Sequence, residues 1–167
     1  MKSSLKISEK LHSAFLLSTA LAAGYPHNQW LTLNKIAEQF HLSQGYLEEI
    51  VAALRRAQLV KGRRGASGGY RLSKDPAAIT FADIVVAIEG PTALVNCEAC
   101  FLQSDCSNET MWQELQTVVI DFFRNKTLAS EARKAKYQKF ATASNTASSE
   151  PTTSRAARVA KIATPTN

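Results

Sequence analysis

The chain has 167 residues, 45% of them hydrophobic, and a formal net charge of +6 at pH 7. This length fits one domain with an appendage and excludes two full enzyme domains, and no run approaches the roughly 18 apolar residues of a membrane span. The basic N-terminal stretch is interrupted by polar side chains where a secretory segment would be continuous, so we expect a cytoplasmic protein.

The charges are unevenly distributed along the chain. From Arg55 to Lys74 there are seven basic residues and no acidic one, whereas from Asp75 to Asp121 there are eight acidic residues and no lysine or arginine. This polarity suggests that a polyanion binds the first segment and avoids the second. A solvated basic loop is the simpler alternative.

Apolar residues at three- and four-residue spacing predict a first helix that ends at Gly24-Tyr25-Pro26. Thr32 and Ser43 are suited to cap two further short helices, which are separated by a tight turn at residues 41–43. Ala37 is a small residue at the point where these helices must cross. Together they form a helix-turn-helix pattern, whose second helix typically enters the major groove of DNA.

The next stretch predicts a β-wing, because its period changes to alternation around a glycine-rich hairpin before Asp75-Pro76 ends it. Three glycines, Gly65, Gly68 and Gly69, allow positive φ and a narrow tip. Arg63 and Arg64 are placed to meet phosphates or base edges.

Beyond the wing, Thr80 is suited to cap a short helix that Gly90-Pro91 ends. A long amphipathic helix is predicted from Met111 to about Arg124, and its apolar stripe suits a dimer seam, although it could instead fold back on its own domain. Residues 127–140 resemble a further, basic helix, and the tail from Ala141 is too rich in Ala, Ser and Thr to bury a core, so we expect it to be disordered.

All three cysteines lie within ten residues, as Cys97, Cys100 and Cys106. An odd, clustered set in a cytoplasmic protein argues against disulfides and for metal binding or redox chemistry. Zinc, an iron–sulfur cluster and free or redox-active thiols all fit the bare spacing.

The string "LVKGRRGASGGYRLSKDPAAITFADIVVAIEGP", with the helices before it and the cysteines after it, resembles the IscR/NsrR (Rrf-two) family of bacterial winged-helix regulators over roughly residues 5–132. The resemblance implies a mainly α fold with a small β-wing: a winged helix-turn-helix domain plus a long dimerisation helix. It also implies homodimers on palindromic double-stranded promoter DNA and, in many members, an iron–sulfur cluster held by three cysteines. One departure is that only Glu98 and Ala99 separate the first two cysteines, where the family has a longer spacer, so the two-iron or four-iron type stays open.

These observations divide the chain into four expected regions. They are a DNA-binding domain (1–90), a cluster-binding loop (91–109), the dimerisation helix with a C-terminal helix (110–140) and the tail (141–167). The candidate DNA contacts are Ser43, Gln44, Gly45, Tyr46, Glu49, Arg63, Arg64, Ser67 and Arg71. Tyr46 has the alternative of partial burial against the wing.

The candidate metal ligands are Cys97, Cys100 and Cys106, and the resemblance suggests a fourth, non-cysteine ligand. His12, Glu9 and Glu109 are the candidates, and in some family members the corresponding group near the first helix comes from the other subunit. The alternative for His12 is an ordinary half-buried helix residue.

The leading hypothesis is a DNA-binding regulator, a repressor or activator, that senses iron, redox state or nitric oxide through an iron–sulfur cluster. A regulator with structural zinc or thiol-oxidation sensing is the alternative. A thiol or metal enzyme is disfavoured, because the sequence has no P-loop, catalytic triad or paired catalytic carboxylates.

Overall fold

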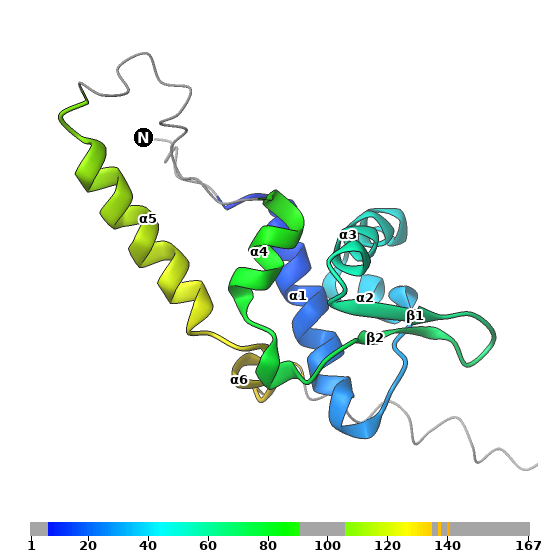
Figure 1. Ribbon diagram of the computed structural model, residues 1–167. Helices are drawn as coiled ribbons and strands as arrows, with labels where there is room; N and C mark the ends of the chain where they lie inside the picture. Colours follow the sequence, from blue (N-terminus) through cyan, green and yellow to red (C-terminus); the bar gives the residue numbers. More distant parts are fainter. Residues whose placement is uncertain (1–6, 91–105, 135–136, 138–139, 141–167) are drawn as a thin grey trace, which may run out of the picture.

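A computed structural model describes residues 7–90 and 106–134, together with Tyr137 and Phe140. Its elements in chain order are α1 (Glu9–Gly24), the 3-10 turn η1 (Tyr25–His27), α2 (Leu33–Phe40), α3 (Gln44–Arg56), β1 (Val60–Arg63), β2 (Gly69–Leu72), the 3-10 turn η2 (Pro76–Ala78), α4 (Phe81–Glu89), α5 (Glu109–Arg124) and α6 (Leu128–Ala132). This part of the chain is mostly helical with one small antiparallel sheet (Figure 1), which confirms the predicted fold class.

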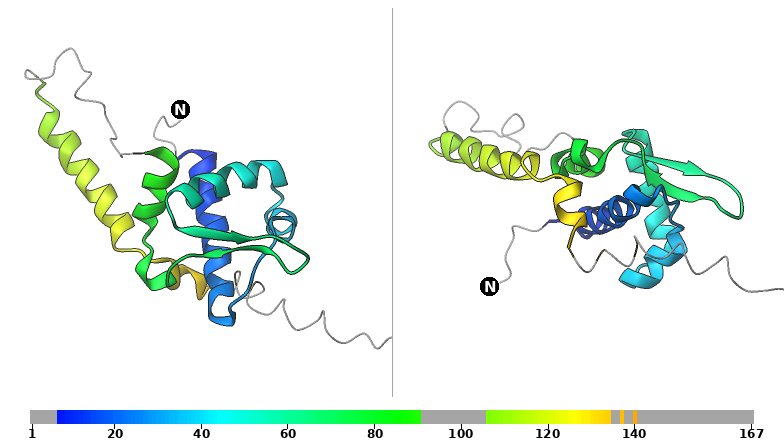
Figure 2. Two further views of the ribbon diagram at one scale, coloured as in Figure 1. Left: turned by 45° about the vertical axis from the view of Figure 1, so that its right-hand side comes forward. Right: turned by 90° about the horizontal axis from the view of Figure 1, so that it is seen from below.

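Helix α1 forms the centre of the fold and packs against α3, α4, α6 and β2 (Figures 1 and 2). The Ser8 hydroxyl accepts a hydrogen bond from the backbone N–H of Leu11 at 3.0 Å, which satisfies one of the free donors at the helix start. Even polar Thr19 is buried in α1, and its hydroxyl donates to the Phe15 carbonyl at 2.8 Å. Because α1 is covered on most sides, its neighbours share one contiguous core.

Helices α2 and α3 form the predicted helix-turn-helix. His41 ends α2 in the left-handed conformation with φ 55°, and the Leu42 N–H donates to the Ala37 carbonyl at 3.0 Å. Ser43 begins α3 as predicted, because its hydroxyl accepts from the backbone N–H of Tyr46 at 3.2 Å. The turn is therefore closed by local hydrogen bonds on both sides.

Thr32 occupies the predicted cap position of α2, with φ −80° and ψ 146°, but its side chain makes no capping hydrogen bond. The capping prediction is right in position and wrong in its hydrogen bond. One residue earlier, Leu31 pairs with Tyr70 of β2 through two backbone hydrogen bonds of 3.0 and 2.8 Å. The sheet thus fixes the chain as it enters α2.

The wing is the hairpin of β1 and β2, and it projects from the body beside α3 in each view (Figures 1 and 2). Gly65 and Gly69 adopt positive φ, 107° and 144°, as predicted. Gly68 does not, and it is required for a different reason: a Cβ there would lie 2.3 Å from the Arg63 carbonyl oxygen. The turn is thus too tight for any side chain at Gly68.

Helix α4 begins with a full capping box. The Thr80 hydroxyl accepts from the Asp83 N–H at 3.2 Å, while the Asp83 carboxylate accepts from the Thr80 N–H at 2.8 Å. The start of α4 also holds the end of α5, because the Phe81 N–H donates to the Lys126 carbonyl at 2.9 Å.

The predicted basic helix over 127–140 is not continuous. Helix α6 ends at Ala132 and residues 133–134 form a turn, whereas Tyr137 and Phe140 are again helical. Leu128 and Ala132 are buried in the core beside α1, so burial against α1 and η2 defines this short helix. Tyr137 and Phe140 are buried too, and their rings lie 6.3 and 5.7 Å from that of Phe40 in α2.

Helix α5 leaves the body at an angle (Figure 1) and contains no fully buried residue. Four large apolar side chains on it are exposed: Met111, Leu115, Val118 and Phe122. The predicted apolar stripe is therefore present, and it is open to solvent in the single chain. Among the described residues, no helix is long and apolar enough to cross a membrane.

Candidate nucleic-acid interface and cysteine site

The start of α3 exposes polar side chains, while its opposite side packs into the core. Of the residues predicted to contact DNA, Ser43, Gln44, Gly45 and Glu49 are exposed and Tyr46 is half-buried against the core. The Gln44 amide donates to the Glu48 carboxylate at 3.0 Å, which orders its side chain along the helix surface. This exposed end has the groups that read base edges and bind phosphates.

The wing adds a group of cations next to α3. Arg64 at the tip is exposed, and no described residue bonds its side chain. Arg63 and Arg71 are already engaged: Arg63 donates to the Ser67 carbonyl and Arg71 donates to the Asn28 side-chain oxygen. The predicted cations therefore fall into one free group at the tip and two ordered groups nearer the body.

Trp30 is the residue at this interface that the sequence reasoning missed. The guanidinium carbons of Arg63 and Arg71 lie 4.8 and 5.0 Å from the centre of its ring. The local sequence carries no signal for this contact, because it depends on two segments far apart in the chain: Leu31 is opposite Tyr70, which places Trp30 beside the strand that carries Arg71.

None of the acidic side chains that the structure describes forms an ion pair with the wing cations. Within the described part of the chain the ion pairs are Asp121 with Arg124, at 3.4 Å, and Glu131 with Lys134. Both pairs lie in or after α5, away from the wing. The wing therefore carries uncompensated positive charge, which attracts a polyanion such as nucleic acid.

The cysteine site is described at one end only. Cys106 is half-buried directly before α5, its thiol is unpaired, and its carbonyl accepts from the Glu109 N–H at 3.2 Å. Glu109 is half-buried in the first turn of α5 and its carboxylate accepts from the Gln113 amide at 2.9 Å. Cys97 and Cys100 lie outside the described residues.

The other candidate ligands lie at the start of α1. Glu9 and His12 are exposed, so the alternative of a half-buried His12 is wrong in its burial. The Ser8 hydroxyl donates to the Glu89 carboxylate, which ties this end of α1 to the end of α4. In every view the start of α5 is apart from the start of α1 (Figures 1 and 2), so within one chain the described candidates form two separate groups, Cys106 with Glu109 and Glu9 with His12. No cluster of three or more metal-binding side chains occurs among the described residues.

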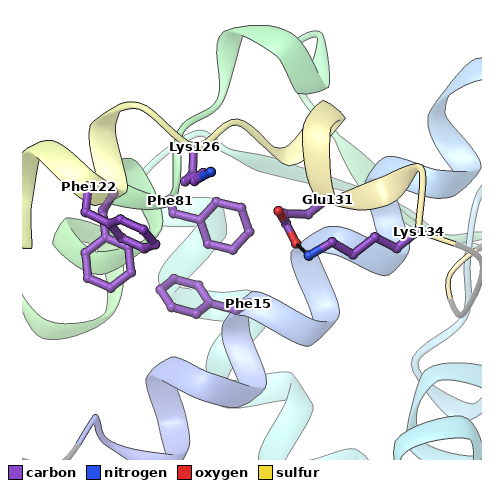
Figure 3. A pocket seen from close by; sticks show the side chains of 7 residues that line it. Phe15, Phe81, Phe122, Lys126, Glu131 and Lys134 are labelled. Carbon is purple, nitrogen blue, oxygen red and sulfur yellow. Dashed lines mark hydrogen bonds and ion pairs between the residues drawn. The ribbon is translucent and has the colours of Figure 1, made fainter.

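A pocket of about 380 Å³ lies where α5 meets the body (Figure 3). Its walls come from α1, α4, α5 and α6, with Phe15 lying 4.8 Å from Phe81 and 5.6 Å from Phe123, ring centre to ring centre. Phe122, part of the exposed stripe, lines the same pocket. The C-terminal half of α5 is therefore anchored by aromatic packing, next to the surface that the stripe leaves open.

Comparisons with known proteins agree with this geometry. IscR of Vibrio cholerae is 34% identical over 99 residues, which are 58% of this chain and 57% of that protein. CymR of Bacillus subtilis is 34% identical over 124 residues, 74% of this chain and 87% of that protein.

Solved structures show the same likeness in three dimensions. B. subtilis CymR, described as the global cysteine regulator, has a TM-score of 0.66 at 35% identity and covers 75% of this chain and 97% of its own. T. potens IscR has a TM-score of 0.64 at 33% identity, and the match covers 79% of this chain and 93% of the IscR chain. The family model described as "Rrf2: Iron-dependent Transcriptional regulator" matches residues 7–133. With a helix-turn-helix, a basic wing and a match over most of its length, the chain belongs to the Rrf2 family of transcriptional regulators.

Proposed function

We propose that the protein is a cytoplasmic transcriptional regulator that binds palindromic promoter DNA as a homodimer through the start of α3 and the wing. The observation that carries this proposal is the exposed polar end of α3 beside a wing whose cations have no acidic partner in the described part of the chain. One such module makes too few contacts for tight specific binding, so two half-sites and two chains are needed.

Arg64 is the wing residue best placed to read a base, because it is exposed at the tip and no described residue forms a hydrogen bond or ion pair with its side chain. The Arg64→Ala variant is expected to weaken binding to an operator selected from random DNA by about 1–3 kcal/mol and to relax the preference at one position of each half-site. The control is Arg124→Ala, which removes an exposed arginine on α5 that is already paired with Asp121. Equal affinity of the unmodified protein for operator and scrambled duplexes would contradict the proposal.

We further propose that Cys97, Cys100 and Cys106 hold an iron–sulfur cluster. Cys106 is half-buried with a free thiol and lies three residues before Glu109, which suits a cluster ligand with a non-cysteine neighbour, and the iron-dependent description of the family model supports the same choice. The bound cluster would supply a centre that depends on iron supply and reacts with oxidants or nitric oxide.

The position of the ligands suggests how the chain uses this centre. Glu109 shares the start of α5 with Cys106, so it is the fourth-ligand candidate from the same chain. His12 and Glu9 project from α1, apart from the start of α5, and are the candidates for a ligand from the partner subunit. The segment that carries the cysteines joins the end of α4 to the start of α5, so a cluster bound by it would fix the angle between the DNA-binding part and the proposed dimer helix.

Thiol-oxidation sensing without a cluster is the second candidate. The alignment with CymR covers 74% of this chain, against 58% for the IscR relatives, and one solved CymR structure, from Staphylococcus aureus, is of an oxidized form. Structural zinc at the three cysteines is a further alternative.

Anaerobic purification separates these alternatives. The cluster proposal predicts a brown protein with iron and acid-labile sulfide, both lost in the triple variant Cys97→Ala, Cys100→Ala, Cys106→Ala and retained in the control Ser107→Ala. Stoichiometric zinc without sulfide, or a colourless metal-free protein with reversible thiol oxidation, would defeat it. Glu109→Gln, His12→Ala and Glu9→Gln test the fourth ligand through their visible spectra.

A further inference from the structure

Two arginines of the wing share one aromatic ring. The guanidinium carbon of Arg63 lies 4.8 Å from the ring centre of Trp30, and that of Arg71 lies 5.0 Å from it. Tryptophan is the aromatic side chain that attracts a cation most strongly, and arginine is the cation most often found on it. The ring therefore orders two side chains that would otherwise sample many rotamers.

The backbone fixes this arrangement in three places. Arg63 pairs with Gly69 across the hairpin, and Arg71 is two residues beyond Gly69, so both side chains leave the same face of the sheet. Trp30 reaches that face because Leu31 is hydrogen-bonded to Tyr70 in both directions. Gly69 permits the approach, since a Cβ at its φ of 144° would lie 2.6 Å from the Leu31 carbonyl oxygen.

Each arginine also has a fixed second contact. Arg63 donates to the Ser67 carbonyl across the turn, and Arg71 donates to the side-chain oxygen of Asn28, two residues before Trp30. The two guanidinium planes are thus held by the ring and by a neighbouring oxygen, in contrast to the unattached Arg64.

The arrangement brings two positive charges together without a negative one. Neither arginine takes part in an ion pair within the described residues, and the buried Nε of Arg71 has no hydrogen-bond acceptor there. Like charges held on one ring repel each other, and an unsatisfied buried donor is unfavourable. A bound anion relieves the repulsion, and arginine pairs are suited to phosphate oxygens.

We propose that Trp30 is a positioning residue that holds Arg63 and Arg71 as a preorganised phosphate-contact platform at the base of the wing. The platform binds phosphates of the DNA backbone, while Arg64 at the tip contacts base edges in the groove. This inference rests on the proposed function, because the phosphates are those of the bound duplex. Trp30, an uncharged residue in a loop, would thus contribute to the electrostatic part of DNA binding.

The test is the salt dependence of DNA binding by the full-length protein. Each phosphate contact contributes about 0.9 to the slope of log K against log salt, so losing two contacts lowers the slope by about 1.8 per half-site. With the affinity extrapolated to about 1 M salt unchanged, this corresponds to roughly 20-fold weaker binding per half-site at about 0.2 M salt. Trp30→Ala should produce this change although it removes no charge.

Matched variants separate positioning from packing. Trp30→Leu keeps an apolar side chain at the same half-buried place and should show the reduced slope, whereas Trp30→Phe keeps a ring and should retain most of the slope of the unmodified protein. Trp112→Phe, which replaces the tryptophan of α5, is the control and should change nothing. Circular dichroism and thermal unfolding verify that each variant is folded.

A double-mutant comparison completes the test. Arg63→Gln with Arg71→Gln should lower the slope as much as Trp30→Ala, and adding Trp30→Ala to that pair should lower it no further. The platform would be overturned if folded Trp30→Leu had the same salt slope as the unmodified protein, or if the effects of Trp30→Ala and of the two arginine substitutions on that slope were fully additive. Neither result would contradict operator recognition. A different result separates the two proposals. If the unmodified protein bound operator and random-sequence duplexes equally, and the Trp30 variants still had a reduced salt slope on random-sequence DNA, the platform would be supported and the proposed function refuted.

Discussion

On the proposed function, replacing two apolar residues of α5 by aspartate should convert the homodimer to monomer without unfolding the chain. The variant is Val118→Asp with Phe122→Asp, and these side chains are 66% and 59% exposed in the single chain. Because they support little of the protomer's own core, the free energy of unfolding of the protomer should change by less than about 1 kcal/mol. In the proposed homodimer, these two side chains are buried at the interface between the chains.

The magnitude follows from the exposed stripe. Its four side chains, Met111, Leu115, Val118 and Phe122, are between 36% and 66% exposed. Full burial of such a side chain contributes about 1.5–3 kcal/mol, so burying the exposed half contributes about 1 kcal/mol. A two-fold interface uses the set twice, which gives roughly 8 kcal/mol before the entropy of association is subtracted. The two substitutions place four unpaired carboxylates in the interface of two chains, and the free-energy cost of burying them exceeds the net free energy of association that remains.

Sedimentation or light scattering measures the mass directly. The control is Gln113→Asp with Thr117→Asp, which adds the same charges to exposed positions of the same helix, away from the stripe. The control should remain dimeric, while the stripe variant should become monomeric and lose tight binding to a palindromic operator. A dimer mass retained in the stripe variant at micromolar concentration would show that the interface lies elsewhere.

Two further predictions concern stability. Ser43→Ala should lower the free energy of unfolding by about 1 kcal/mol, because it removes the 3.2 Å cap bond of α3. Thr32→Ala should change it by less than about 0.5 kcal/mol, because the Thr32 side chain makes no such bond. Equal effects of the two substitutions in urea denaturation would contradict this difference. Truncation after Phe140 should leave the free energy of unfolding and operator discrimination unchanged, and loss of discrimination in the truncated protein would refute this. Phe140→Ala, by contrast, should lower the free energy of unfolding by about 3 kcal/mol, because this ring is 5% exposed and packs on Phe40.

The elements that the sequence predicted well are those in which local signals coincide. Ser43 and Thr80 are cap residues followed by apolar side chains at helical spacing, and both make the cap bonds that their positions predict. Gly65 and Gly69 adopt the positive φ expected in the hairpin. In each case the determinant lies within a few residues of the element, so spacing and residue type were sufficient.

The elements that were missed depend on residues far apart in the chain. Trp30 joins the wing because Leu31 is paired with Tyr70, some forty residues further along the chain. The interruption of the predicted C-terminal helix after Ala132 accompanies two separate packing partners: Leu128 and Ala132 are buried beside α1, whereas the rings of Tyr137 and Phe140 lie near Phe40 of α2. A periodicity argument contains no information on such partners.

The same long-range contacts suggest how a change at the cysteines would reach the DNA. The C-terminal end of α5 is fixed to the body, since Phe81 and Leu128 make backbone hydrogen bonds of 2.9 Å to Lys126 and Ile79. The other end is joined to α4 through the cysteine loop, at the point where Glu89 is bonded to Ser8 of α1. A helix fixed at one end turns about that end when the other is released. On the proposed function, loss of the ligand set would therefore change the angle between α5 and α3, and with it the spacing of two recognition helices across a dimer.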